Sequence, residues 1–346
     1  MKLKDRFYIF VVLICLVIGY ILLSRTTYDE VDIEDTLNIA RTNLDSNQEI
    51  IVFDSKNPFN FRDILRDLDK ISNQQVYAVI TYPEEKKDRY PVVIGVAGSL
   101  GWSDHHRDYL QRYRSMGIAT ITLHSFSSRD VSSTVGEQVS ATVAMIVHDS
   151  YMLLSELSTR DNIDIDRVAI TGWSLGGGVS LFSAWEDVQL ALTPNLMFAA
   201  HLPIYPPCIA NVDKLQFSKS PIHILIGESD NWVPAQPCVE LIDGLEFKGK
   251  DNANITVFPN AHHSFDRNSE LKVVEHGYSL TDCRLVLDTD GTVRTEDYNF
   301  PLSNSLLQKL GLYFCADRGP TMGGNKLAAI QAKGIAMNFM KKHLLD

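Results

Sequence analysis

The sequence predicts an α/β fold in which helices cover both faces of a mostly parallel central sheet. Three features of the 346-residue chain support this prediction. Short apolar or β-branched runs alternate with longer segments of helical period, which is typical of strand–helix repeats. The runs are close to continuous in apolar character, as expected for parallel strands buried on both faces. No internal repeat or low-complexity tract interrupts the alternation.

The predicted elements follow a polar segment over residues 26–70, which we expect to be an irregular lead-in packed on the domain. Strands are predicted at 75–82, 91–96, 118–123, 167–171, 196–204, 222–226 and 255–258. Helices are predicted at 104–116, 137–157, 175–186 and 233–245. A hairpin is predicted at 285–293, because Asp290-Gly291 suits a tight turn in which glycine supplies a positive φ. Residues 71–346 are therefore expected to form one domain.

The N-terminus combines three basic residues with an uninterrupted apolar run over residues 7–23. At about 1.5 Å per residue this run reaches roughly 25 Å, the short end of the range that spans a bilayer. The basic flank favours a cytoplasmic N-terminus and places the rest of the chain outside, in a periplasmic or extracellular position. A cleaved signal peptide is the alternative, but the run exceeds the usual length and no A-x-A-like site follows. We expect residues 1–25 to form a membrane anchor or an uncleaved signal.

Charge and cysteine content narrow the class of protein further. A net charge of -11 argues against a nucleic-acid-binding surface, which needs lysine and arginine to neutralise phosphates. Four cysteines follow the predicted anchor, an even number in a compartment where disulfides persist, and the sequence alone permits three pairings. Buried free thiols are the alternative. The four residues are Cys208, Cys238, Cys283 and Cys315.

The strongest motif lies where the predicted strand at 167–171 meets the predicted helix at 175–186. Residues 172–176 read G-W-S-L-G, which is G-x-S-x-G in the strand–turn–helix context that an exposed serine nucleophile requires. Glycines on both sides of Ser174 let neighbouring backbone approach without a clash. The helix N-terminus supplies backbone N–H groups for a developing oxyanion, and Leu175 is the first candidate. We predict Ser174 as a nucleophile.

A serine nucleophile needs a base, and the base needs an acid that orients it. In the α/β-hydrolase fold both follow the serine, at the ends of later strands. Asp230 follows the strand at 222–226, and we prefer it to Glu228 because it lies further into the loop. His262 and His263 follow the strand at 255–258. Adjacent side chains point apart, so only one can reach the serine, and this pattern leaves the choice open.

The loop after the strand at 91–96 is the expected position of a second oxyanion donor, and we assign it to Ser99. The glycines of residues 95–101 do not have the spacing of a dinucleotide-binding fingerprint. The adjacent histidine pairs at 105–106 and 262–263 are poorly placed to chelate one metal, and no cysteine or carboxylate completes a set. We expect neither a cofactor nor a metal.

Three segments resemble the dienelactone hydrolase family of α/β-hydrolases, and the likeness covers about residue 57 to the C-terminus. They are G-W-S-L-G-G at 172–177, G-E-S-D at 227–230 with Trp232 and Pro234, and A-H-H-S-F-D at 261–266. Family members place the catalytic histidine directly before a small residue and phenylalanine, which implies His263. The founding enzymes use cysteine where this chain has Ser174, and the loop glutamate that restrains their thiol is replaced around Gly98. The chain looks closer to a divergent exported branch, with a substrate other than dienelactone.

The resemblance also implies roles for residues outside the predicted triad. Arg129 and Arg267 are placed similarly to arginines that hold the substrate carboxylate in dienelactone hydrolase. Surface salt bridging is the alternative for both, because long charged side chains are mostly solvated. In the exported branch Cys208 and Cys238 recur as a pair, and we predict this disulfide together with a second one between Cys283 and Cys315.

The predicted function is hydrolysis of small carboxylic esters or lactones through an acyl-enzyme. A peptidase or an acyltransferase would use the same three residues, so both remain alternatives. A membrane-tethered binding module that keeps the fold without chemistry is a third possibility. It is disfavoured because serine, acid and histidine are all present in the expected order.

Overall fold

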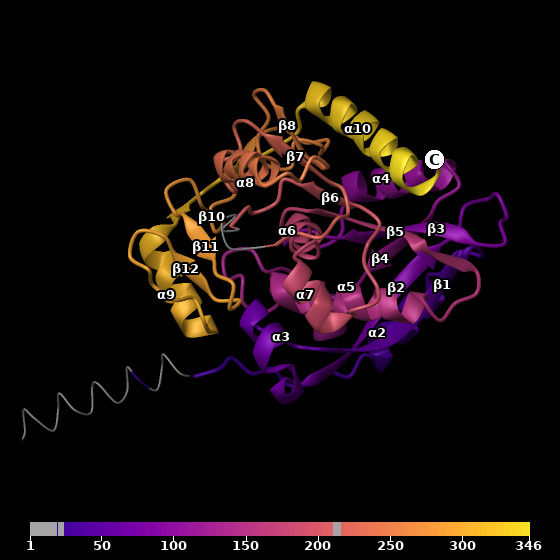
Figure 1. Ribbon diagram of the computed structural model, residues 1–346, viewed down its shortest axis with the longest axis horizontal. Helices are drawn as coiled ribbons and strands as arrows, with labels where there is room; N and C mark the ends of the chain where they lie inside the picture. Colours follow the sequence, from indigo (N-terminus) through magenta and orange to yellow (C-terminus); the bar gives the residue numbers. More distant parts are fainter. Residues whose placement is uncertain (1–18, 20–23, 210–215) are drawn as a thin grey trace, which may run out of the picture.

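The structure is a computed structural model that describes residue 19 and residues 24–209 and 216–346. Eight strands form one sheet in the order β1-β2-β4-β3-β5-β6-β7-β8 (Figure 1). Strand β2 runs antiparallel to both of its neighbours, β1 and β4. The remaining neighbours, β4, β3, β5, β6, β7 and β8, all run parallel to one another. The predicted α/β fold with a mostly parallel sheet is confirmed. Its strands are β1 (Gln48–Lys56), β2 (Asn73–Thr81), β3 (Tyr90–Val96), β4 (Ala119–Leu123), β5 (Ile163–Trp173), β6 (His201–Ile204), β7 (Ile222–Gly227) and β8 (Ala253–Phe258).

Helices cover both faces of this sheet, as the strand–helix alternation predicts. One face carries α4 (Asp104–Ser115) and α10 (Lys326–Leu344), which contact each other. The other face carries α3 (Phe61–Arg66), α5 (Val143–Leu157), α6 (Leu175–Phe182) and α7 (Glu186–Leu192). Further helices are α2 (Glu34–Thr42), α8 (Gln236–Phe247) beside β8, and the 3-10 turns η1 (Leu68–Lys70) and η2 (Ser127–Arg129).

Several element boundaries differ from the predicted ones for local reasons. The helix predicted at 137–157 begins only at Val143, because Thr142 accepts a hydrogen bond from the Met145 N–H as its N-cap. The helix predicted at 175–186 divides into α6 and α7, and extended backbone at Trp185 separates the two. The strand predicted at 196–204 is reduced to β6.

The segment over residues 26–70, expected to be irregular, contains α2, β1 and α3. Strand β1 pairs along its whole length with β2 and forms an edge of the sheet. Its buried side chains alternate with more exposed ones, so that Ile51, Phe53 and Ser55 face the core. This period of two is that of a half-buried strand, which differs from the continuous apolar runs that define the inner strands.

A cap, defined here as residues 264–325, lies between β8 and α10. It holds the helix α9 (Ser305–Cys315) and the predicted hairpin, which is confirmed as β11 (Leu285–Leu287) paired with β12 (Val293–Thr295). Four shorter strands complete it: β9 (Lys272–Val273), β10 (Tyr278–Ser279), β13 (Asp317–Arg318) and β14 (Thr321–Met322). Figure 1 shows β10, β11, β12 and α9 gathered at one end of the molecule.

Two disulfides are present, and they match the predicted pairs. Cys208–Cys238 joins the loop after β6 to α8, and Cys283–Cys315 closes the cap across a sequence separation of 32. Disulfides persist in oxidising compartments outside the cytoplasm. The anchor predicted over residues 7–23 lies outside the described residues, Gly19 excepted. Within the described ranges, no helix has the length and apolar character needed to cross a bilayer.

Replacing both Cys283 and Cys315 by alanine should destabilise the cap, because the bond restricts the unfolded chain over a loop of 32 residues. We expect the free energy of unfolding to fall by about 2–4 kcal/mol. Urea denaturation of the double variant measures this, with reduced wild type as the control. An unchanged midpoint would show that the bond contributes nothing to the stability of the cap.

Candidate active site

Four loops meet at one edge of the sheet, because the carboxyl ends of parallel strands lie together. They follow β3, β5, β7 and β8. Ser99, Ser174, Asp230 and His263 lie in these loops, one in each. The topology therefore brings together the residues that the sequence separates.

Ser174 occupies a strained turn between β5 and α6, with φ 56° and ψ −116°. A side chain on either flanking glycine would not fit this turn. A Cβ on Gly172 would lie 2.1 Å from the Gly176 oxygen, and one on Gly176 would lie 2.2 Å from the Val96 oxygen. A non-glycine residue persists in such a conformation only where its surroundings enforce it. The turn projects Ser174 beyond the end of β5.

The side chains of Ser174, His263 and Asp230 form a continuous hydrogen-bonded chain. His263 Nε2 lies 2.9 Å from Ser174 Oγ, and His263 Nδ1 lies 2.7 Å from Asp230 Oδ2. The other carboxylate oxygen, Oδ1, accepts the N–H groups of Trp232 at 2.9 Å and Val233 at 3.0 Å. Asp230 and His263 are both buried. With Nδ1–H donating to Asp230, Nε2 is free to accept the serine proton.

The imidazole of His263 is fixed by packing that sequence reasoning did not identify. The rings of Tyr205 and Trp232 each lie 4.9 Å from it between centroids. The Tyr205 hydroxyl donates at 2.9 Å to Oδ1 of Asp266, and burial raises the pKa of both groups. Asp266 ends the A-H-H-S-F-D segment, so a sequence signal for it existed. Asp266 is hydrogen-bonded to Tyr205, and the Tyr205 ring in turn packs against the His263 imidazole.

The alternative acid and base residues point elsewhere. His262 Nδ1 lies 2.8 Å from Thr321 Oγ1 in the cap. Glu228 is exposed and accepts the Asn260 N–H at 3.0 Å. The geometry at Ser174 thus involves one member of each competing pair, Asp230 and His263.

The predicted oxyanion donors lie beside Ser174. Leu175 is the first residue of α6, so its N–H has no acceptor within the helix. The N–H of Ser99 likewise donates to no backbone oxygen among the described residues. A Cβ added to Gly98 would lie 3.0 Å from the Trp173 oxygen and 3.4 Å from Ser174 Cβ. The loop that carries Ser99 therefore passes directly over the serine.

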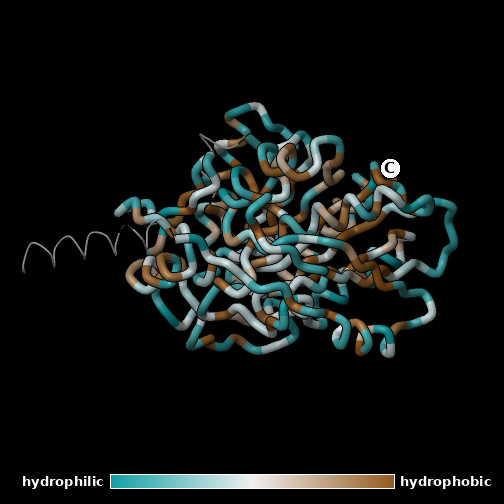
Figure 2. Tube along the Cα trace, turned by 90° about the horizontal axis from the view of Figure 1, so that it is seen from below, coloured by the Kyte–Doolittle hydropathy of each residue, from teal (hydrophilic) through white to brown (hydrophobic). Residues whose placement is uncertain are grey.

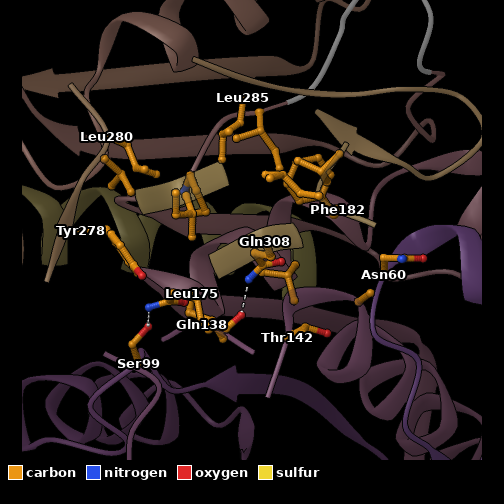
Figure 3. Close-up of a pocket in the computed structure, with 18 of the residues that line it drawn as sticks. Asn60, Ser99, Gln138, Thr142, Leu175, Phe182, Tyr278, Leu280, Leu285 and Gln308 are labelled. Atoms are coloured by element: carbon orange, nitrogen blue, oxygen red, sulfur yellow. Dashed lines mark hydrogen bonds between the residues drawn. The ribbon is translucent and has the colours of Figure 1, made fainter. Parts of the chain in front are cut away.

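An apolar cavity of about 180 Å³ opens next to Ser174 and Ser99. Figure 3 shows Phe182, Leu280 and Leu285 along one side of it, facing Ser99, Gln138 and Thr142. The cap contributes part of the apolar lining, including Leu280, Leu285 and Leu312. Among the described residues, no charged side chain lines this cavity.

Two glutamines connect the cap to the loop over the serine. Gln138 Nε2 donates to Ser99 Oγ at 3.3 Å, and Gln308 Nε2 of α9 donates to the Gln138 carbonyl at 2.6 Å (Figure 3). These residues come from distant segments and belong to no motif, so no sequence signal could have identified them. A helix of the cap is thereby linked to the predicted oxyanion loop.

The structure corrects the expectation that Arg129 contacts substrate. Its guanidinium pairs with Asp149 through contacts of 2.7 Å and 2.8 Å. Its remaining N–H groups donate to Asn57 and to the backbone oxygens of Ser125 and Lys56. All five donors of the buried side chain are engaged, which leaves none for a ligand.

Arg267 lines a second, small cleft beside Ser174, and Trp173 and His263 also line this cleft. It donates to Ser103 Oγ at 3.2 Å, and its Nε has no hydrogen-bond partner in the described part of the chain. No acidic residue among those described forms an ion pair with it. Substrate contact by Arg267 stays a prediction.

The adjacent residues His105 and His106 pack beneath this site. Burial lowers the pKa of His105 to about 3 and lowers the pKa of His106 well below its ordinary value, so both rings are neutral near pH 7. His106 Nδ1 accepts the Ser103 N–H at 3.3 Å and caps α4. In the described part of the chain, no group of three or more potential ligands is arranged to hold a metal.

Two known proteins are similar in sequence to parts of this chain. A Yersinia pestis protein described as a candidate carboxymethylenebutenolidase is 27% identical over 223 residues, covering 59% of this chain and 79% of that protein. A Fusarium vanettenii protein described as a dipeptidyl-aminopeptidase B is 27% identical over 138 residues, but these are 34% of this chain and only 15% of that protein.

The fold is shared with solved structures. The structure of Thermogutta terrifontis esterase 2 phosphorylated by paraoxon has a TM-score of 0.51 at 14% identity, covering 87% of this chain and 96% of that one. The sequence model of the dienelactone hydrolase family matches residues 76–281, which is more than half of the chain. The protein therefore belongs to the dienelactone hydrolase family and is a carboxylic ester hydrolase.

Proposed function

We propose that the protein is a serine esterase that cleaves carboxylic esters with a neutral, apolar acyl group through an acyl-enzyme. The observation that carries this proposal is the hydrogen-bonded chain from Asp230 through His263 to Ser174, beside an apolar cavity. A serine hydroxyl is a poor nucleophile at neutral pH, and a buried, oriented imidazole provides the base that it lacks.

In the first half of the reaction, Ser174 Oγ bonds to the ester carbonyl carbon while its proton passes to His263 Nε2. The N–H groups of Ser99 and Leu175 stabilise the negative charge on the carbonyl oxygen, where preorganised donors act most strongly. His263 then returns the proton to the departing alkoxide as the carbon–oxygen bond breaks. Asp230 holds the imidazole and stabilises its charged form. Water repeats the same steps and releases the acid.

The cavity favours esters with an apolar acyl group. Its described lining is mostly apolar and carries no charge. A methylene chain that enters the cavity is transferred out of water, which is favourable, whereas a charged group would lose its hydration without gaining a charged partner. A dipeptide with a free ammonium would meet the same obstacle, which favours an esterase over a peptidase. An acyltransferase would use the same steps with another acceptor in place of water.

We also propose that residues 7–23 tether the enzyme to a membrane, with residues 71–346 as the catalytic domain on the non-cytoplasmic side. The apolar run and its basic flank support the tether. The two disulfides support the side, because they belong in an oxidising compartment.

The first prediction from this mechanism concerns Ser174 and His263. Ser174→Ala should abolish both fluorophosphonate labelling and hydrolysis of a p-nitrophenyl ester, and His263→Ala should lower kcat by at least about 1000-fold. His262→Ala is the matched control and should stay near wild type, since it bonds to Thr321. Circular dichroism checks that each variant is folded. Normal turnover by Ser174→Ala would refute the mechanism.

The second prediction concerns the acyl group. Hexanoyl and octanoyl p-nitrophenyl esters should be preferred to the acetyl ester, because each added methylene fills apolar space. An acyl chain ending in a carboxylate should lower kcat/KM by about 100-fold or more, since the buried charge would lack a partner. Steady-state kinetics with matched neutral and charged substrates measure this. Equal kcat/KM values for the two would place the acyl group outside the cavity.

The third prediction distinguishes Arg267, for which we expect a role in substrate binding, from Arg129, for which we expect a role in stability. Arg267→Met should raise KM by about tenfold for esters whose alcohol part carries a carboxylate, because a charge-assisted contact is lost. Neutral esters should be unaffected. Arg129→Met should instead lower the free energy of unfolding by about 3–5 kcal/mol, because Asp149 would be buried without its partner. Unchanged kinetics for charged esters in Arg267→Met would assign this arginine no role in binding.

A further inference from the structure

Helix α9 of the cap presents an exposed apolar face. This face, here called the α9 face, consists of Leu306, Leu310, Tyr313 and Phe314. At about 100° per residue these positions fall within one stripe roughly 100° wide along the helix. Tyr313 is 73% exposed and Phe314 is 77% exposed, which is far more than ordinary packing leaves to large apolar side chains.

The opposite side of the same helix belongs to the active site. Leu312 lines the cavity, and Gln308 both lines it and donates to Gln138, the partner of Ser99. Gly311 allows the segment with Phe300 and Leu302 to pack closely, because an added Cβ would lie 2.3 Å from Leu302. One helix therefore carries an apolar outer surface and part of the cavity wall.

The beginning of the described chain is bonded to the start of α9. Asn304, the N-cap residue, donates through Nδ2 to the Ser24 carbonyl at 3.1 Å, and Thr26 Oγ1 accepts the Ser305 N–H at 2.7 Å. Residue 24 directly follows the apolar run over residues 7–23. If this run is inserted in a membrane, the bilayer surface lies next to the N-terminal end of α9, which carries Leu306. Figure 2 shows apolar, brown segments at the end of the molecule where Figure 1 places α9.

We propose that the α9 face docks on the surface of a lipid bilayer. Its aromatic and leucine side chains suit the boundary between headgroups and acyl chains, where amphipathic helices lie in the plane of the membrane. Lys309 is exposed beside this stripe, at a position from which its long side chain reaches the headgroups. The neighbouring apolar run selects a bilayer over a second protein as the occupant. Docking would place the wall of the cavity next to the membrane, so esters dissolved in the lipid phase are the substrates nearest to it.

The test uses the full chain reconstituted with phosphatidylcholine vesicles whose acyl chains are dibrominated. In Phe314→Trp the new indole should lie among the lipid chains, and bromine quenches indole emission at short range. Phe247→Trp is the matched control, because Phe247 is 93% exposed at the end of α8, outside the cap. Tyr313→Trp provides a second reporter on the α9 face.

We expect Phe314→Trp and Tyr313→Trp to lose most of their added emission in brominated vesicles relative to unbrominated ones, while Phe247→Trp keeps it. Flotation of the same samples reports the tether separately, and hydrolysis of a soluble acetyl ester reports the proposed chemistry. Protein that floats with equal quenching at all three positions overturns the docking and leaves the tether intact. Protein that does not float and shows no quenching overturns both.

Discussion

The site depends on one backbone constraint, the strained, positive-φ conformation of Ser174 at the junction of β5 and α6. Hydrogen bonds hold this residue on both sides, from its N–H to the Ile204 oxygen and from the Gly178 N–H to its carbonyl, each 2.9 Å long. The neighbouring strand and the helix thus enforce a conformation that an isolated serine would avoid. Without this turn the hydroxyl would not reach His263.

The cap forms part of the cavity beside this turn. Members of one fold differ mainly in the segments that surround a common site. Here the residues between β8 and α10 form a disulfide-closed unit that supplies part of the apolar cavity wall and, through Gln308 and Gln138, contacts the loop that carries Ser99. The segment that lines part of the cavity is therefore also linked to the loop beside Ser174.

Arg129 illustrates how a residue in a suggestive sequence position can have a structural role. Its place after β4 resembles that of a ligand-binding arginine, yet α5 brings Asp149 within 2.7 Å of it. A buried carboxylate without a partner is costly, so the ion pair holds the guanidinium in the core. Arg267 has no such partner among the described residues, and it remains at the cleft beside Ser174. Sequence position alone could not distinguish these two environments.

The sequence by itself determined the alternation of strands and helices, the serine turn and the order of the residues around it, because these depend on local periodicity and on glycine spacing. It missed the edge strand β1, whose pattern is weaker than that of the inner strands, and it left the two histidines open until the resemblance favoured His263. Only the tertiary structure decided the cavity, the glutamine contacts and the partner of Arg129. Each of these joins segments far apart in the chain, and a contact of that kind leaves no periodic signal in the sequence.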